Sequence, residues 1–106
     1  MKLFFIIQAI NSIEKFVNDM TYNELISDDK TVSAVIRKFE IIGEASKIIS
    51  QDIKDRHPEI PWKNMAGMRN ALIHAYCGVD YKLVWDSIKI QIPKVKLLLE
   101  RVLEEL

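Results

Sequence analysis

The residues best suited to chemistry lie in one short run of the chain, Arg69-Asn70-Ala71-Leu72-Ile73-His74-Ala75-Tyr76. An arginine guanidinium is permanently charged and suits a phosphate, and a histidine imidazole moves protons near neutral pH. The pair is the minimum equipment for cleaving RNA without a metal. His74 would take the proton from a ribose 2′-hydroxyl while Arg69 stabilises the charge that develops on phosphorus. A symmetry-related His74 from a second copy would then protonate the leaving oxygen.

The element expected to carry this run is a helix from about Trp62 to Tyr76. On such a helix Asn70 and His74 are four residues apart and in contact, so the Asn70 amide would fix the tautomer and orientation of the imidazole. Arg69 and Tyr76 share a face. Arg69 and His74, five residues apart, are separated by about 140° around the helix axis. A site that uses both therefore needs the Arg69 side chain to wrap around, the helix to end near His74, or a second copy of the motif.

Simpler interpretations compete with this one. A lone Arg69 and His74 on a helix are more often a surface cation and a hydrogen-bonded, partly buried histidine. Tyr76 would then be an aromatic residue at the end of a bundle with its hydroxyl in water. His57, which precedes a proline, is expected to be solvated, and Glu44 is either a buried partner of Arg69 or a solvated carboxylate.

Charge and cysteine content limit the function classes. Fifteen Lys and Arg balance fifteen Asp and Glu, so no overall field attracts nucleic acid or an anionic membrane, and any anion site must be local. Residues 60–79 contain no Asp or Glu but include Lys63 and Arg69. One cysteine, Cys77, cannot close an internal disulfide, and we expect it to be a small buried apolar residue rather than a member of a thiol dyad. With two histidines and one cysteine, we expect no metal site.

The composition favours an all-α fold in a single domain covering residues 1–106. The chain is 49% hydrophobic with three glycines and three prolines, which argues against a turn-rich β fold. Apolar residues at helical spacing predict helices over about 3–20, 29–57, 62–76 and from Asp80 to the end. Gly43 marks an expected close helix crossing, and Pro93 should kink or break the last helix. The prediction is an up-and-down bundle of four helices, or five where Pro93 divides the last.

The beginning of the chain is expected to be a core helix rather than a signal peptide. Gln8 and Asn11 interrupt the apolar run, no cleavage site follows, and Glu14 arrives early. The run is also too short for a membrane span, so we expect a cytoplasmic protein. This helix is apolar beyond a single stripe, which makes a homodimer a possible arrangement. Thr21-Tyr22-Asn23-Glu24 has the form of a capping box that opens a short helix.

Four segments together resemble the HepT-like family of HEPN-domain proteins. They are Ile41-Ile42-Gly43-Glu44-Ala45, Pro58-Glu59-Ile60-Pro61-Trp62, Gly67-Met68-Arg69-Asn70-Ala71-Leu72-Ile73-His74-Ala75-Tyr76 and Val84-Trp85. The resemblance covers nearly the whole chain in the same order. From the resemblance we expect the sequence to start inside the family's first helix, and Ala75 occupies a position that is more often polar in the family.

The resemblance implies a homodimeric HEPN-like bundle in which two Arg-x4-His motifs face each other across a cleft. It implies a metal-independent endoribonuclease, the toxin of a toxin–antitoxin module, with Arg69 and His74 catalytic, Asn70 supporting and no cofactor. It also implies that Tyr76 accepts AMP from ATP, transferred by an MntA-like minimal nucleotidyltransferase antitoxin. AMP placed beside Arg69 would block RNA by charge and bulk.

Two other function classes remain open at this point. One is a non-catalytic helical module that docks a nucleotidyltransferase and binds nucleotide or RNA without cutting it. The other is a purely structural dimer. The presence of Arg69, His74 and Tyr76 together favours the ribonuclease toxin.

Overall fold

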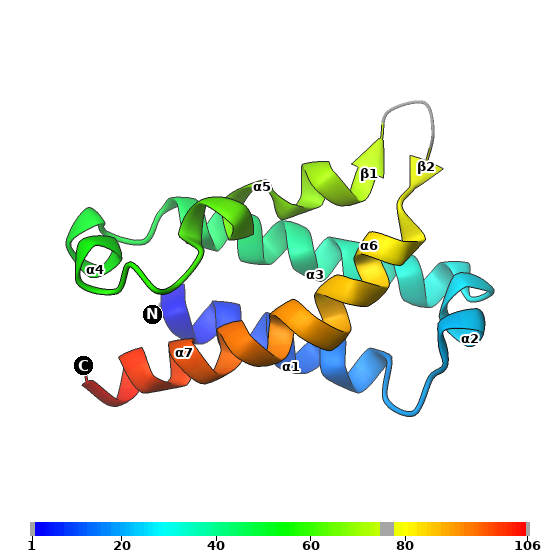
Figure 1. The fold of residues 1–106 in the computed structure, drawn as a ribbon, viewed down its shortest axis with the longest axis horizontal. Coiled ribbons are helices and arrows are strands. Elements are labelled where there is room, and N and C mark those ends of the chain that lie inside the picture. Colours follow the sequence, from blue (N-terminus) through cyan, green and yellow to red (C-terminus); the bar gives the residue numbers. More distant parts are fainter. Residues whose placement is uncertain (1, 75–77, 106) are drawn as a thin grey trace.

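Helices dominate the structure, a computed structural model that describes residues 2–74 and 78–105. In chain order the elements are α1 (Lys2–Phe16), α2 (Tyr22–Ile26), α3 (Asp29–Lys47), α4 (Gln51–Arg56), α5 (Trp62–Leu72), β1 (Ile73–His74), β2 (Gly78–Val79), α6 (Tyr81–Asp86), a π-helical turn (Ser87–Gln91) and α7 (Ile92–Glu105). Helix α3 packs on both α1 and α5, and the last helical stretch crosses in front of α1 (Figure 1). The all-α prediction is confirmed, with two two-residue strands added.

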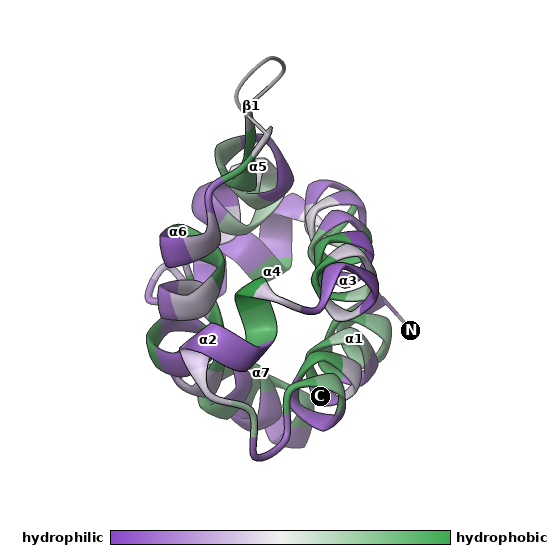
Figure 2. Cartoon of the chain, turned by 90° about the vertical axis from the view of Figure 1, so that its right-hand side faces the viewer, coloured by the Kyte–Doolittle hydropathy of each residue, from purple (hydrophilic) through white to green (hydrophobic). Residues whose placement is uncertain are grey.

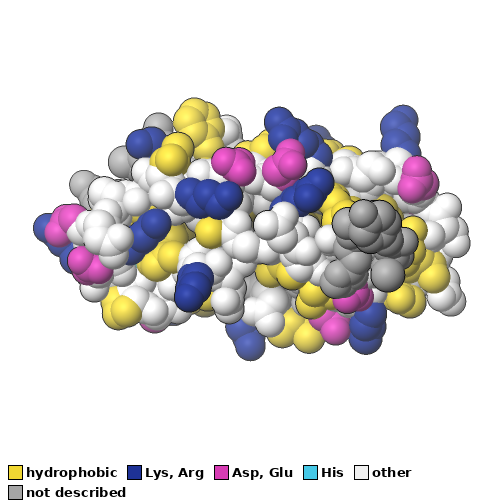
Figure 3. Space-filling view, turned by 90° about the horizontal axis from the view of Figure 1, so that it is seen from above, with side chains coloured by type: hydrophobic (Ala, Val, Ile, Leu, Met, Phe, Trp, Pro, Cys, Tyr) yellow, Lys and Arg dark blue, Asp and Glu magenta, His cyan; other side chains and the backbone are white. Residues whose placement is uncertain are grey.

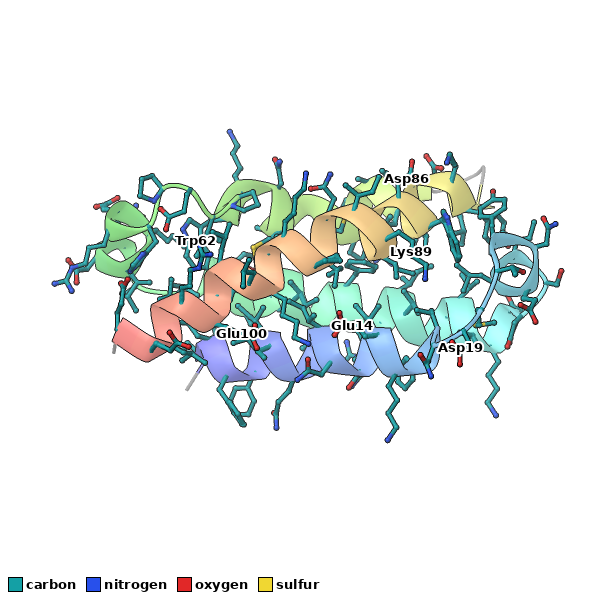
Figure 4. All side chains as sticks on the ribbon, turned by 60° about the horizontal axis from the view of Figure 1, so that its bottom comes forward. Glu14, Asp19, Trp62, Asp86, Lys89 and Glu100 are labelled. Atoms are coloured by element: carbon teal, nitrogen blue, oxygen red, sulfur yellow. The ribbon has the colours of Figure 1, made fainter. Side chains whose placement is uncertain are left out.

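The core forms because the apolar stripes of the helices point inward, as the spacing predicted. Figure 2 shows the hydrophobic faces of α1, α3 and α7 turned toward the centre. The hydrophobic side chains buried on these three helices are Leu3, Ile6, Ile7, Ala9, Ile10, Ile13, Val32, Val35, Phe39, Ile42, Ile92, Val95, Leu99 and Val102. Lys96 Nζ on α7 also donates to Glu14 Oε1 on α1 at 2.8 Å. Figure 4 places Glu14 and Glu100 on these two neighbouring helices.

Side-chain caps fix where several helices begin. The Thr21 hydroxyl accepts from the Glu24 backbone N–H at 3.1 Å, and the Glu24 carboxylate accepts from the Thr21 N–H at 2.9 Å. The predicted capping box is therefore confirmed. Asp80, where the last helical stretch was predicted to begin, caps α6 with its carboxylate, which accepts from the Leu83 N–H at 3.1 Å.

The prediction of one long helix over 29–57 is wrong. Helix α3 ends at Lys47, and α4 begins after Ser50. The Ser50 hydroxyl accepts from the Ile53 N–H at 3.3 Å, so it serves as an N-cap and competes with continuation of the helix. Apolar spacing alone could not detect this break, because Ile49 remains buried on the inner side of the connection.

Two backbone features that bear on α5 follow the predictions. Gly43 lies at the crossing of α3 and α5, where an added Cβ would be 3.1 Å from the carbonyl oxygen of Ala66. The last helical stretch departs from α-helical geometry just before Pro93, where the Ile92 N–H donates to the Ser87 carbonyl five residues earlier. The buried Ser87 hydroxyl contacts the Met68 sulfur on α5 at 3.6 Å, so this π-helical turn packs against the residue that precedes Arg69.

Candidate active site at the end of α5

Helix α5 ends four residues earlier than predicted, and His74 lies beyond it. Ile73 has extended backbone angles (φ −121°, ψ 123°), and Ile73 and His74 pair antiparallel with Val79 and Gly78. Gly78 has φ +81°, a conformation that favours glycine, and the Asp80 N–H donates to the Leu72 carbonyl at 2.8 Å. Backbone groups at the end of α5 are therefore hydrogen-bonded to the hairpin instead of to a further turn of helix. Asn70 and His74 are therefore not on one continuous helix, and the predicted i to i+4 contact between them does not arise. Of the three arrangements that would allow Arg69 and His74 to share a site, the structure has the helix that ends near His74.

The side chain of His74 lies outside the described part of the structure, as do Tyr76 and Cys77. The backbone of His74 belongs to β1, immediately after α5. The predicted roles of these three residues therefore remain predictions.

Arg69 lies in the last turn of α5 with 45% of its side chain exposed. Its Nε is 3.7 Å from Oε2 of Glu40 on α3, and the other oxygen of Glu40 contacts the Arg37 guanidinium. Glu40 thus bridges two arginines across the α3–α5 interface. Figure 3, which views the molecule from the side of α5, shows acidic side chains lying among the basic ones.

Glu40 is the site residue that the sequence reasoning did not find. The acid-free window from residue 60 to residue 79 suggested a purely basic surface, whereas α3 brings a carboxylate to Arg69 from outside that window. The signal was available in the spacing, because Glu40 precedes the predicted crossing residue Gly43 by three positions and so lies on the same face of α3.

Glu44 takes the second of the two roles considered for it. Its side chain is 71% exposed, and Oε1 is 3.6 Å from Nζ of Lys47 on the same helix. It is a solvated carboxylate, and the carboxylate beside Arg69 is that of Glu40.

Asn70 is exposed and lines a small cavity with Arg69. This cavity, of about 140 Å³, lies between α3 and α5 and is lined by Glu40, Gly43, Glu44, Lys47, Ala66, Arg69 and Asn70. A larger, mostly apolar groove of about 500 Å³ runs between α5 and the stretch that contains the π-helical turn and α7. The end of α5 therefore has a polar hollow on its α3 side and an apolar groove that reaches α7.

Trp62 and His57 contact each other at the start of α5. Trp62 is a core residue, and its indole N–H donates to the His57 carbonyl at 3.1 Å. The expectation that His57 is solvated is wrong. Its side chain is 15% exposed and lies between the carboxylates of Glu59 and Glu105, at 3.3 and 3.6 Å. Glu105 belongs to α7, which is distant from His57 in the sequence, so the sequence around His57 could not indicate this contact.

Within residues 2–74 and 78–105, no three His, Cys, Asp or Glu side chains gather in a way that could hold a metal ion. In the same part of the chain, no helix is long and apolar enough to cross a membrane.

The family profile described as ribonuclease HepT-like matches residues 6–102. The chain belongs to this family. Among curated relatives of this HepT-like chain, the "Probable ribonuclease HepT" of Thermococcus cleftensis is 52% identical over 91 residues, 86% of this chain and 83% of the relative. The "Putative RNase MJ1380" of Methanocaldococcus jannaschii is 46% identical over 94 residues, 89% of this chain and 86% of the relative. The "Putative RNase MJ0125" of the same organism is 44% identical over 104 residues, 98% of this chain and 90% of the relative.

The resemblance inferred from the sequence is thus confirmed, and the enzyme class of the HepT-like family is ribonuclease. No solved structure matches the chain. In this HepT-like chain, α5 presents the exposed guanidinium of Arg69, and the backbone of His74 follows directly after this helix in β1.

Proposed function

We propose that this protein is a metal-independent endoribonuclease toxin that cleaves RNA with Arg69 and His74 at a cleft between two copies of the chain. The observation that carries the proposal is the placement of Arg69 within a HepT-like ribonuclease. Glu40 approaches its guanidinium at Nε, with 3.7 Å between Nε and Oε2, and the two terminal nitrogens of the guanidinium can bind a phosphate.

The reaction that these groups suit is internal transesterification. His74 accepts the proton of the ribose 2′-hydroxyl, the 2′-oxygen attacks phosphorus, and the bond to the 5′-oxygen breaks. Arg69 stabilises the negative charge on the non-bridging oxygens in the transition state. A protonated His74 of a second copy delivers a proton to the leaving 5′-oxygen, so the products are a 2′,3′-cyclic phosphate and a free 5′-hydroxyl. No step requires a metal ion or other cofactor.

The homodimer is part of the proposal because the chain supplies one copy of the motif and the reaction uses two imidazoles. The apolar groove beside α5 and the exposed Phe4 and Phe5 on α1 provide apolar surface that a second copy could cover.

Regulation by AMPylation completes the proposal. A cognate minimal nucleotidyltransferase, acting as antitoxin in the cytoplasm, would bring ATP to Tyr76. The phenolic oxygen of Tyr76 would attack the α-phosphorus and release pyrophosphate. Tyr76 is two residues beyond His74, so the added phosphate would compete with RNA for Arg69 by charge and by bulk.

The test of catalysis is incubation of the purified protein with a mixed RNA pool in the presence of EDTA. We expect wild type to produce fragments ending in 2′,3′-cyclic phosphate, and Arg69→Ala and His74→Ala each to be slower by at least about 100-fold. Arg101→Ala, an exposed arginine on α7, is the matched control and should cleave like wild type. Equal cleavage by all variants would show that a contaminant acts. RNA binding without cleavage would favour the non-catalytic module instead.

The test of regulation adds ATP and the candidate nucleotidyltransferase and measures intact mass. Wild type should gain the mass of AMP and lose cleavage activity, and Tyr76→Phe should do neither. An adduct that persists on Tyr76→Phe would assign the modification to another residue.

A further inference from the structure

The small cavity beside Arg69 combines a cation suited to phosphate with two carboxylates. Its lining includes the crossing residues Gly43 and Ala66, with Glu40 and Arg69 at one end and Lys47 at the other, two turns further along α3. Its volume is about 140 Å³. A cavity of this size has room for one planar base.

Carboxylates repel phosphate, so their presence in a site for RNA requires an explanation. Glu40 pairs with arginines, since each of its oxygens faces one. Glu44 does not pair with an arginine in this way. Within the described residues its ion pair is the 3.6 Å contact with Lys47, and 71% of its side chain is exposed, so its oxygens retain acceptor capacity toward the cavity. A carboxylate beside a nucleic-acid backbone site can recognise N–H donors of a base, which carry no charge of their own.

We propose that this cavity is a subsite that selects guanine at a nucleotide flanking the cleaved bond. Guanine presents two adjacent donors, N1–H and the N2 amino group, next to the O6 acceptor on its Watson–Crick edge. Glu44 accepts from the two donors, and Lys47, one turn further along α3, donates to O6. Cytosine and adenine place an acceptor nitrogen beside the amino group, and uracil has a single N–H between two carbonyls, so each matches the pair less well.

The subsite rests on the proposed function, because Arg69 at the end of the cavity binds the phosphate of the RNA. The position of that phosphate decides which base of the RNA enters the cavity. Asn70 also lines the cavity, beside Arg69 on α5, so its amide can contact the sugar or base of the same nucleotide. The base specificity is then a property of α3, whereas the cleavage chemistry belongs to α5 and the hairpin.

The first experiment maps cleavage positions in a library of short RNAs with randomised sequence. Wild type should enrich guanine about fivefold or more at one fixed position next to the cleaved bond, the range expected of a bidentate base contact. Glu44→Gln should reduce that enrichment to below about twofold, because its amide group places a donor opposite a donor. Glu104→Gln, the same change at an exposed site on α7, should retain the enrichment. Absence of guanine enrichment in wild type, or unchanged enrichment in Glu44→Gln, would overturn the subsite.

The second experiment does not depend on cleavage. The His74→Ala protein is titrated with GMP, AMP, CMP and UMP while the amide resonances of Gly43 and Asn70 are followed by NMR. GMP should bind at least about fivefold more tightly than UMP, and Glu44→Gln should abolish the difference. Equal affinities overturn the subsite. Selective GMP binding by His74→Ala, together with no RNA cleavage by wild type, would instead reject the proposed function and leave the subsite standing.

Discussion

Arg69 on α5 and Glu40 on α3 form an ion pair across the helix crossing, with 3.7 Å between Nε and Oε2. Both side chains are partly exposed, so the pair contributes little to folding stability. Its effect is to restrict where the guanidinium points. Because Glu40 also contacts Arg37, two arginines are held on one carboxylate at the face where we place the phosphate.

Replacing the Glu40 carboxylate should distinguish the orientation of Arg69 from the affinity of the enzyme for RNA. We expect Glu40→Gln to lower kcat for RNA cleavage about tenfold, because Arg69 loses the partner that orients it, while KM does not rise, because a negative charge near the phosphate is removed. The free energy of unfolding should change by less than about 1 kcal/mol.

Steady-state kinetics and urea unfolding of the same preparations check this prediction. Glu104→Gln serves as the charge-matched control. A rise in KM at constant kcat would show that Glu40 contacts the substrate rather than positioning Arg69.

The two helical glycines of the α3–α5 region should respond in opposite directions to alanine. Gly43→Ala places a methyl group 3.1 Å from the Ala66 carbonyl oxygen, which belongs to a neighbouring helix backbone, so we expect destabilisation by about 1–3 kcal/mol. Gly67→Ala meets nothing within 4 Å and should stabilise by about 0.5–1 kcal/mol through helix propensity. Chemical denaturation measures both, and stabilisation by Gly43→Ala would show that α5 can shift away from α3.

The hydrogen bond between Lys96 on α7 and Glu14 on α1 should make the stability of the fold fall at alkaline pH. The hydrogen bond that the Lys96 ammonium donates to Glu14, assisted by the charges of Glu14 and Glu100, raises the pKa of Lys96 against the opposing effect of burial. A raised pKa means that the stabilisation is complete below the ordinary lysine pKa of about 10.4 and is lost as pH rises through the raised value.

Thermal unfolding of wild type and Lys96→Met between pH 8 and pH 11.5 checks this expectation. Wild type should have the higher Tm at pH 8, and the difference should shrink above about pH 10.4. A difference that stays constant across the range would mean that packing of the lysine stem, and not its charge, stabilises the contact.

The capping box at the start of α2 should contribute measurably despite its exposure. Thr21→Ala removes the hydroxyl that accepts from the Glu24 N–H and should cost about 1 kcal/mol, whereas Thr21→Ser keeps the hydroxyl and should cost much less. Urea unfolding distinguishes them. Equal losses would assign the effect to the Thr21 methyl group rather than to the cap.

Features with a local cause were predictable from the sequence. The inward stripe of α1, the Thr21 cap and the close approach at Gly43 each depend on residue types within one or two helical turns. The break at Ser50 was local too, but a single hydroxyl competes there with an apolar pattern that continues through it. The end of α5 at Leu72 depends on a hydrogen bond from Asp80, eight residues later, so helical periodicity had no information about it.

The motif of the candidate site was predictable from the sequence, whereas its surroundings were predictable only in part. Arg69 and His74 lie five residues apart in one short run, and their residue types alone indicate phosphate and proton chemistry. Glu105 reaches His57 through the packing of a distant helix, for which the sequence has no local signal. The position of Glu40, three residues before Gly43, does place it on the face of α3 that meets α5.

The termination of α5 at Leu72 also bears on how such a motif can change during evolution. Inside a continuous helix, each inserted residue would rotate whatever follows by about 100° and separate the arginine from the histidine. Here an insertion after Leu72 would fall into a hairpin and leave Arg69 and its contact with Glu40 in place. The number of residues between Arg69 and His74 is therefore not fixed by helical phase, and relatives with a longer interval could retain the same arginine position.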